Sequence, residues 1–302
     1  MTLPIKVDVG VDVKEDSKSA QKFLDKLSAG CAALFSPISK VLDAKADAIV
    51  RLTQARTEEE VAAIQRRAMD RVVLQEVRRQ HNIEQIIQGA AVHATELPPP
   101  TDEPLDPDWL NRFFDEAKDI SQETMQALLS KILAGEVQKP GSFSRTTLAV
   151  VRNMSKDDAE CFAKVAPYAW RTGESGSTFE DVFVPGEDSE FEPARYTWFK
   201  YHSVLTLGAV GLMHAHSLVV QPDVYLRHQN LSYSVYNPRN KEFNAFSFTP
   251  AGAELIDAIP TVTDPRYQQQ FLGALSRMGI ATACDVNDRS QCVEAGNEKK
   301  PR

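Results

Sequence analysis

The two histidines closest together in the chain are His214 and His216, which are separated by one residue. On a β-strand this spacing puts both imidazoles on one face, where two ring nitrogens can bind the same metal ion. A stable site needs further ligands, and no carboxylate or cysteine follows at ligand spacing. The pair also falls where a helical pattern gives way to a strand. We therefore expect no metal site and no cofactor.

The usual fingerprints of nucleotide binding and hydrolysis do not occur in the chain. It has no G-x-x-x-x-G-K-[ST], no G-x-G-x-x-G and no G-x-S-x-G motif. These motifs place backbone amides around phosphates or expose a nucleophilic serine, so their absence removes the commonest enzyme classes. The sequence favours a protein that is not an enzyme, and the alternative is an enzyme without a known motif, with Glu136 and Arg145 in its cleft.

One candidate binding site surrounds a Pro-Gly turn between two predicted helices. Its polar residues are Glu136, Lys139, Ser142, Ser144 and Arg145. The second helix opens at this turn, and the free amides of a helix start can bind an anion or a charged group of a partner. The competing interpretation is a turn followed by a helix cap, with no ligand.

A second candidate lies near the C-terminus, where segments 231–236 and 242–248 alternate like strands. The sequence N-P-R-N between them is typical of a turn, so we expect a β-hairpin. In a winged helix such a hairpin is the wing, and Tyr233, Tyr236, Arg239 and Lys241 would contact nucleic acid. The helix before it is not strongly basic, which weighs against this alternative.

A series of capped helices organises the middle of the chain. Asp106 or Asp108, Ser121, Ser142 or Ser144, and Ser155 each precede an apolar helical stripe, as N-cap residues do. Two to six residues separate these helices. Loops this short leave neighbouring helices antiparallel, so residues 106–170 should form a bundle.

The region before the bundle is also helical. Residues 19–96 include a helix predicted from Thr57 to Ala91, which is long enough to be mostly solvated or to join a loose coiled coil. We therefore expect a homo-oligomer formed through this helix. Its arginine-rich stretch, 66–79, is either a salt-bridged exposed face or a contact for phosphates. The apolar tract 27–41 is better buried against helices than laid on a membrane surface.

Three further features complete the predicted organisation. Residues 1–18 alternate as an extended arm, 97–105 form a proline-rich linker, and 287–302 are a polar tail without predicted structure. Between bundle and tail, residues 171–286 mix strand and helix signals. The predicted fold is mainly α with a smaller α+β C-terminal domain that contains a small antiparallel sheet.

Composition restricts the class of protein further. The chain has 302 residues, of which 42% are hydrophobic and 25% charged, as in soluble globular proteins of one or two domains. A net charge of −8 disfavours nucleic-acid binding over the whole surface but allows a local basic face. The chain has no apolar run of about 18 residues and no basic, apolar leader, so we expect a cytoplasmic protein without a membrane span.

Several separated motifs resemble a bacterial family known as a domain of unknown function. They are W-x-x-R-F from Trp109, I-L-A-G-E from Ile132, P-G-S-F-S from Pro140 with T-L at Thr147, and F-S-F-T-P-A-G-A-E-L from Phe246. The resemblance covers roughly residues 50–260. More distantly, the order of these motifs along the chain is similar to that in the abortive-infection alpha proteins of phage defence. The resemblance implies no catalytic residue. It implies a bacterial accessory or defence-associated protein and no mechanism. Our leading interpretation is therefore an accessory protein that acts through protein contacts, in phage defence, and the alternative is a winged-helix nucleic-acid binder.

Overall fold

The computed structural model describes residues 18–31, 58–173, 181–186, 201–215, 218–220, 225–228, 231–259 and 265–284. The chain divides into two compact units, Met1–Arg152 and Asn153–Arg302. The predicted arm, apart from Lys18, and the predicted tail lie outside the described residues, as does most of the tract 27–41. Among the helices that the structure describes, none has the length and apolar character to cross a membrane.

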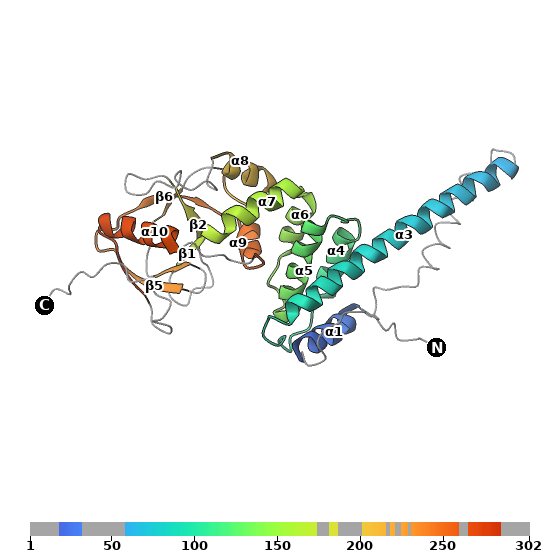
Figure 1. Ribbon diagram of the computed structural model, residues 1–302, viewed down its shortest axis with the longest axis horizontal. Helices are drawn as coiled ribbons and strands as arrows, with labels where there is room; N and C mark the ends of the chain where they lie inside the picture. The colour runs from blue at the N-terminus through green and yellow to red at the C-terminus, as the bar shows by residue number, and fades with distance from the viewer. Residues whose placement is uncertain are drawn as a thin grey trace. The chain divides into compact units, whose positions relative to one another are not determined.

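Unit 1, Met1–Arg152, is helical over its described residues (Figure 1). Its helices are α1 (Lys18–Cys31), α3 (Glu58–Ala94), α4 (Pro107–Ala117), α5 (Glu123–Gln138) and α6 (Arg145–Asn153). The long helix predicted from Thr57 to Ala91 is therefore confirmed as α3. The C-terminal half of α3 packs on α5, where Gly89 lies against Ser130 and the Ser130 Oγ donates to the Ile86 carbonyl at 3.0 Å.

Local capping signals account for several of the helix starts. The Asp106 side chain accepts the amide of Asp108 at the start of α4, and Ser155 forms a capping box with Asp158 at the start of α7 (Lys156–Val165). The expected cap at Ser121 is wrong. Gln122 occupies the N-cap position of α5, and its side chain makes no capping hydrogen bond.

The proline-rich segment is built into unit 1. The Thr101 amide donates to the Gln138 carbonyl at 2.9 Å, and the Lys26 amine donates to the Thr101 carbonyl at 2.9 Å. These bonds tie the segment to α5 and α1. The two units divide after Arg152 instead, so α7 belongs with the sheet and not with the helices α4 to α6.

Unit 2, Asn153–Arg302, combines helices with one antiparallel sheet. Its helices are α7, the short 3-10 helix η1 (Ala166–Tyr168), α8 (Tyr201–Val210), α9 (Pro250–Ile256) and α10 (Pro265–Arg277). Its strands are β1 (Trp170–Gly173), β2 (Asp181–Pro185), β3 (Leu218–Val220), β4 (Tyr225–His228), β5 (Leu231–Tyr236), β6 (Phe243–Ser247) and β7 (Ala281–Cys284). The expected fold, mainly α with a smaller α+β C-terminal part, is confirmed.

The predicted hairpin between β5 and β6 is wrong, although both strands exist. The sheet order is β3-β6-β2-β1-β4-β5-β7, so β5 pairs with β4 and β7 while β6 pairs with β2 and β3. The turn itself forms, because the Asn240 amide donates to the Asn237 carbonyl at 3.2 Å. Turn chemistry is local, whereas the pairing follows from which alternate residues meet the core. These two strands therefore do not form the wing of a winged helix.

One face of the sheet packs on α10. Alternate strand residues meet this helix in a single apolar cluster, which contains Trp170, Phe183, Leu226, Tyr233, Phe243, Ala245, Tyr267, Phe271, Leu272, Ala274, Leu275 and Ile280. On the opposite face of β1, Arg171 pairs with Asp257, just beyond α9, at 2.7 Å. The period-two alternation of strands explains this division into two faces.

Candidate functional site

The carboxylate of Glu136 fixes the turn that follows α5. The residue is 1% exposed, its Oε1 accepts the amide of Gly141 at 2.7 Å, and its Oε2 accepts the amide of Phe143 at 3.0 Å. The Phe143 carbonyl in turn accepts the indole N–H of Trp109 at 2.7 Å. A buried carboxylate held by two amides is stable without a ligand, so Glu136 anchors the loop between α5 and α6.

The remaining polar residues predicted at this corner also serve the turn. The Ser142 hydroxyl donates to the Lys139 carbonyl at 2.7 Å, and the Ser144 hydroxyl accepts the amide of Thr147 at 3.2 Å as the cap of α6. Arg145 pairs with Asp106 at 3.1 Å and Asp108 at 3.4 Å. The structure thus brings the five predicted residues together. An anion would have to compete with two aspartates for Arg145.

The electrostatics of Arg145 follow from this pairing. Its hydrogen bond to Asp106 raises the pKa of the guanidinium. The same bond lowers the pKa of the Asp106 carboxyl. Both groups stay charged at neutral pH. The pair is exposed to solvent, so it orients the start of α4 against α6 and adds little to stability.

In unit 2 the structure separates Tyr233 from the other residues predicted to contact nucleic acid. Tyr233 is 3% exposed and faces α10, where its hydroxyl accepts the Gln268 amide group at 2.7 Å. Burial raises the pKa of this phenol. Arg239 and Lys241 are exposed on the turn after β5. Tyr233 is therefore a core residue, whereas the two cations remain accessible.

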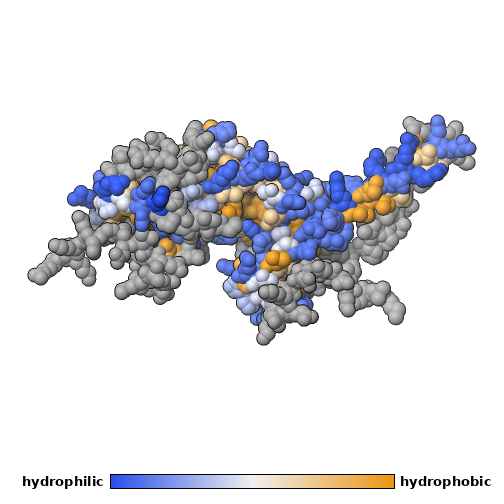
Figure 2. All heavy atoms as spheres, in the orientation of Figure 1, coloured by the Kyte–Doolittle hydropathy of each residue, from blue (hydrophilic) through white to orange (hydrophobic). Residues whose placement is uncertain are grey.

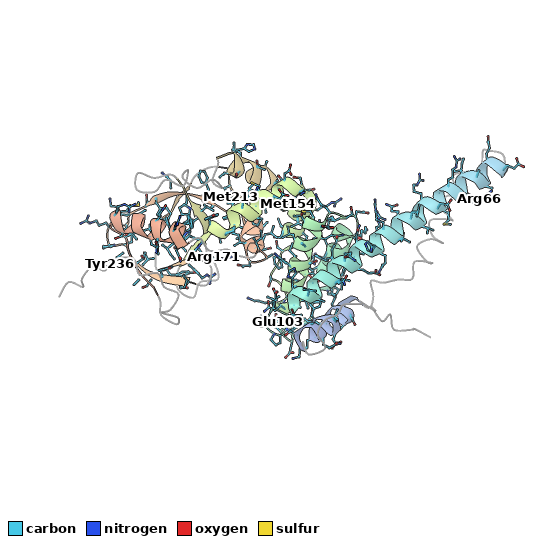
Figure 3. The ribbon with its side chains drawn as sticks, viewed as in Figure 1. Arg66, Glu103, Met154, Arg171, Met213 and Tyr236 are labelled. Carbon is cyan, nitrogen blue, oxygen red and sulfur yellow. The ribbon has the colours of Figure 1, made fainter. Side chains whose placement is uncertain are left out.

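The aromatic residue exposed beside these cations is Tyr236, which is 68% exposed. Figure 3 shows it at the periphery of unit 2. The sequence contains the signal that distinguishes the two tyrosines. They are three positions apart on one strand, so they point to opposite faces of the sheet.

A buried histidine lies in the core of unit 2. The ring of His228 stacks on that of Trp170, with centroids 4.6 Å apart, and its Nδ1 lies 2.9 Å from the Ala169 carbonyl. Its Nε2 is buried and has no hydrogen-bond partner. Burial lowers the pKa of His228 to about 4, against the opposing effect of the bond to Ala169. The imidazole is therefore neutral at pH 7, and Nδ1 donates.

The described part of the chain contains no cluster of side chains arranged to bind a metal ion. No three side chains of histidine, cysteine, aspartate or glutamate there lie close enough together to hold an ion. His214 is exposed just before β3, and His216, its partner in the sequence motif, lies outside the described residues.

The most exposed apolar side chains in unit 1 lie on α3. Leu74 is 71% exposed and Val77 is 58% exposed. Figure 2 shows apolar atoms along the middle of this helix, between stretches of hydrophilic ones. Residues three and four positions apart share one side of a helix. We call the resulting surface the α3 exposed face, and it consists of Arg67, Asp70, Leu74, Val77, His81 and Glu84, all exposed.

Beside this surface, an ion-pair cluster neutralises part of the arginine-rich stretch. Arg79 donates to Asp119 at 2.7 Å and to Glu76 at 3.1 Å, and the bond to Asp119 raises the pKa of Arg79. Arg78 lies 3.9 Å from the same aspartate. This side of α3 is therefore the salt-bridged exterior that the sequence allowed, and the phosphate contact has no structural counterpart at Arg79.

Comparisons with known proteins identify one family. Residues 66–272 match the family described as a protein of unknown function, DUF2806. No curated protein and no solved structure matches the chain. The expected membership of a domain-of-unknown-function family is thereby confirmed, whereas the likeness to abortive-infection alpha proteins stays a prediction. The match covers more than half of the chain, from the N-terminal part of α3 into α10, and the chain belongs to the DUF2806 family.

Proposed function

We propose that this protein acts through protein–protein contacts, without catalysis, and that its first contact is with a second copy of itself through the α3 exposed face. The observation that carries this proposal is the exposure of Leu74 and Val77 on a helix of 37 residues. Large apolar side chains exposed together on a helix are typical of interaction surfaces. Helix α3 is about 55 Å long at 1.5 Å per residue, which is ample for a paired helix.

The spacing of the α3 exposed face fits the seam of a coiled coil. Its six residues follow one another at intervals of three and four, as the a and d positions of a heptad do. Leu74 and Val77 supply one apolar layer at the centre. Polar and charged residues occupy the positions on either side, so the seam is short and the assembly should be reversible.

Charge decides the direction of pairing. In a parallel pair each residue faces its own copy, which would set Arg67 against Arg67 and Glu84 against Glu84. In an antiparallel pair centred between residues 75 and 76, Leu74 meets Val77 of the second copy and Arg67 meets Glu84. Asp70 then meets His81. Every charged residue of the seam thus gains an opposite or hydrogen-bonding neighbour, which favours the antiparallel arrangement.

Sedimentation velocity or light scattering over a concentration series tests the proposal. We expect a dimer that Leu74→Glu converts to a monomer, because the substitution places a charge in the apolar layer. Leu205→Glu, at an exposed leucine of α8 in unit 2, is the matched control and should leave the dimer intact. A wild-type monomer at every concentration would exclude self-association through α3.

A charge exchange tests the direction. Arg67→Glu or Glu84→Arg alone should weaken the dimer, because each creates two like-charge contacts in the symmetric pair. Combining both substitutions restores opposite charges and should restore association. Exposed ion pairs contribute about 0.2–1 kcal/mol each, so the loss of both pairs shifts the dimerisation constant by about two- to thirtyfold. Two weakened single variants without rescue in the double variant would contradict the antiparallel register.

The setting that we propose for this assembly is phage defence, on the resemblance to abortive-infection alpha proteins alone. Bacteria carrying the wild-type gene should form fewer phage plaques than bacteria carrying Leu74→Glu. Equal plaque counts with and without the wild-type gene, over a panel of phages, would remove the antiviral role and leave the self-association untouched.

A further inference from the structure

Among the described residues of unit 2, half of one sheet face is exposed to solvent. On the face turned away from α10, Arg171 of β1 is tied to Asp257, and the neighbouring residues of β2, Val182 and Val184, are buried. Over β5 and β7 the same face is open. Ser234 and Tyr236 are exposed there, together with the alanines of β7 that pair with them.

The open half presents an aromatic ring above small side chains. In the register of β5 and β7, Tyr236 pairs with Ala281 and Ser234 pairs with Ala283. On the other side, Ser234 pairs with Tyr225 of β4, which makes Tyr225 and Tyr236 diagonal neighbours. Diagonal neighbours are separated by about 7–8 Å. A flat surface of this kind can bind a planar ligand that stacks on the Tyr236 ring.

Cationic side chains border the same area. The connection after Tyr236 is fixed by Asn237, whose side chain donates to the Lys241 carbonyl at 2.9 Å and accepts the Lys241 amide at 2.8 Å. Asn240 adopts a φ of 49°, as tight turns require. The turn therefore holds Arg239 and Lys241, both exposed, close to the edge of the ring-bearing face.

We propose that this face binds single-stranded nucleic acid, with a base stacked on Tyr236 and backbone phosphates on Arg239 and Lys241. Bases stack on aromatic side chains irrespective of sequence, and cations along the same surface follow the backbone. The small side chains offer little apolar area to a protein partner. Duplex DNA hides its bases within the stack, so it would gain the phosphate contacts but lose the stacking. A net charge of −8 disfavours binding over the whole surface, so binding requires a local cationic patch of this kind.

Fluorescence anisotropy with labelled oligothymidylate and oligouridylate tests the proposal on the full chain. Tyr236→Ala should weaken binding about tenfold or more, since a stacked base contributes strongly to affinity, whereas Tyr236→Phe should retain it. Arg239→Ala with Lys241→Ala should weaken binding and lower the salt dependence. Each phosphate contact to a single strand adds about 0.7 to the slope, so two lost contacts remove about 1.4.

Controls separate this face from other cationic surfaces. Arg66→Ala with Arg71→Ala, on α3 but outside the α3 exposed face, should leave the affinity unchanged, and Glu242→Gln should tighten binding by removing a negative charge from the same connection. Thermal unfolding verifies that each variant is folded. No binding at low salt, equal affinity for duplex DNA, or an unchanged affinity in Tyr236→Ala would each overturn the proposal. Equal binding of poly-glutamate would assign the face to an acidic protein instead.

Discussion

Lowering the pH from 7 towards 4 should destabilise unit 2 through His228. In the folded chain the pKa of this imidazole is lowered from 6.5 to about 4 by burial. The unfolded chain therefore takes up the proton first as the pH falls. The stability that depends on neutral His228 is fully present above pH 6.5 and is lost progressively down to about pH 4.

The size of the effect follows from the two pKa values. Each pH unit between them corresponds to about 1.4 kcal/mol, which gives a loss of about 3 kcal/mol in the free energy of unfolding. The geometry supports a loss of this order, because protonated Nε2 would be a buried donor without an acceptor. Its stacked neighbour, Trp170, offers a ring face and no lone pair.

Urea denaturation of wild type and His228→Phe, measured between pH 4 and pH 7, isolates this contribution. Carboxylates also titrate in that range, but they are common to both proteins, so the difference between the two curves belongs to His228. The variant lacks the hydrogen bond to the Ala169 carbonyl at every pH, so its free energy of unfolding is lower by a constant amount. We expect the free energy of unfolding of wild type to fall by about 3 kcal/mol relative to that of His228→Phe between pH 7 and pH 4.

A direct titration of the imidazole provides the decisive check. In NMR spectra the ring signals of His228 should stay those of the neutral form down to about pH 4. Titration near 6.5 would show that the ring is solvated in solution. Parallel stability curves for wild type and His228→Phe would equally refute the reasoning, since they would mean that burial does not oppose protonation.

Two further predictions concern stability. Glu136→Gln should lower the free energy of unfolding by about 2–4 kcal/mol in urea denaturation, because one of the two amides at Gly141 and Phe143 would face the N–H group of the new side chain. The control Glu123→Gln, exposed on the same helix, should lower it by less than about 1 kcal/mol. Gly252→Ala should lower the melting temperature, because a Cβ there would lie 2.1 Å from the Leu212 carbonyl oxygen. Gly273→Ala should raise it slightly, because its Cβ meets only the Arg277 guanidinium at 3.5 Å, within a helix. Equal stability of Glu136→Gln and wild type, or of the two glycine variants, would contradict these assignments.

The helices could be predicted where the determining interaction is local. Asp106, Ser155 and Thr249 each bond to an amide two or three residues ahead, so the sequence alone identifies the start of α4, α7 and α9. Gly279 ends α10 with a φ of +87°, which glycine adopts without strain. Such interactions do not depend on the rest of the fold.

The strand pairing could not be predicted from the same kind of signal. A turn at Asn237–Asn240 forms whether or not the strands on either side of it pair. What separates β5 from β6 is the burial of Tyr233 and Phe243 in one cluster under α10, with β2, β1 and β4 between the two strands. That outcome depends on residues far apart in the chain, which periodicity within one segment does not report.

The candidate sites show the same division between local and long-range information. The sequence grouped Glu136 with Arg145, and both do lie at one corner, but it could not show that the carboxylate turns inwards to the amides of Gly141 and Phe143. It favoured the long helix as a contact surface but could not show which side of that helix stays exposed. The packing of α3 on α5 shows that Leu74 and Val77 lie on the exposed side.

Self-association and single-strand binding, if both hold, predict a dependence on oligonucleotide length. A dimer carries two Tyr236 faces, and a single strand is flexible enough to reach both once it is long. The second contact then forms at a high effective concentration, so long oligonucleotides should bind more tightly than short ones by tenfold or more. Leu74→Glu should abolish this difference while leaving the affinity for a short oligonucleotide unchanged, because the sheet face is intact in the monomer. Tyr236→Ala should reduce the affinity at both lengths and leave the dimer intact. A length dependence that survives Leu74→Glu would show that a single copy binds the whole strand, and the two surfaces would then act independently.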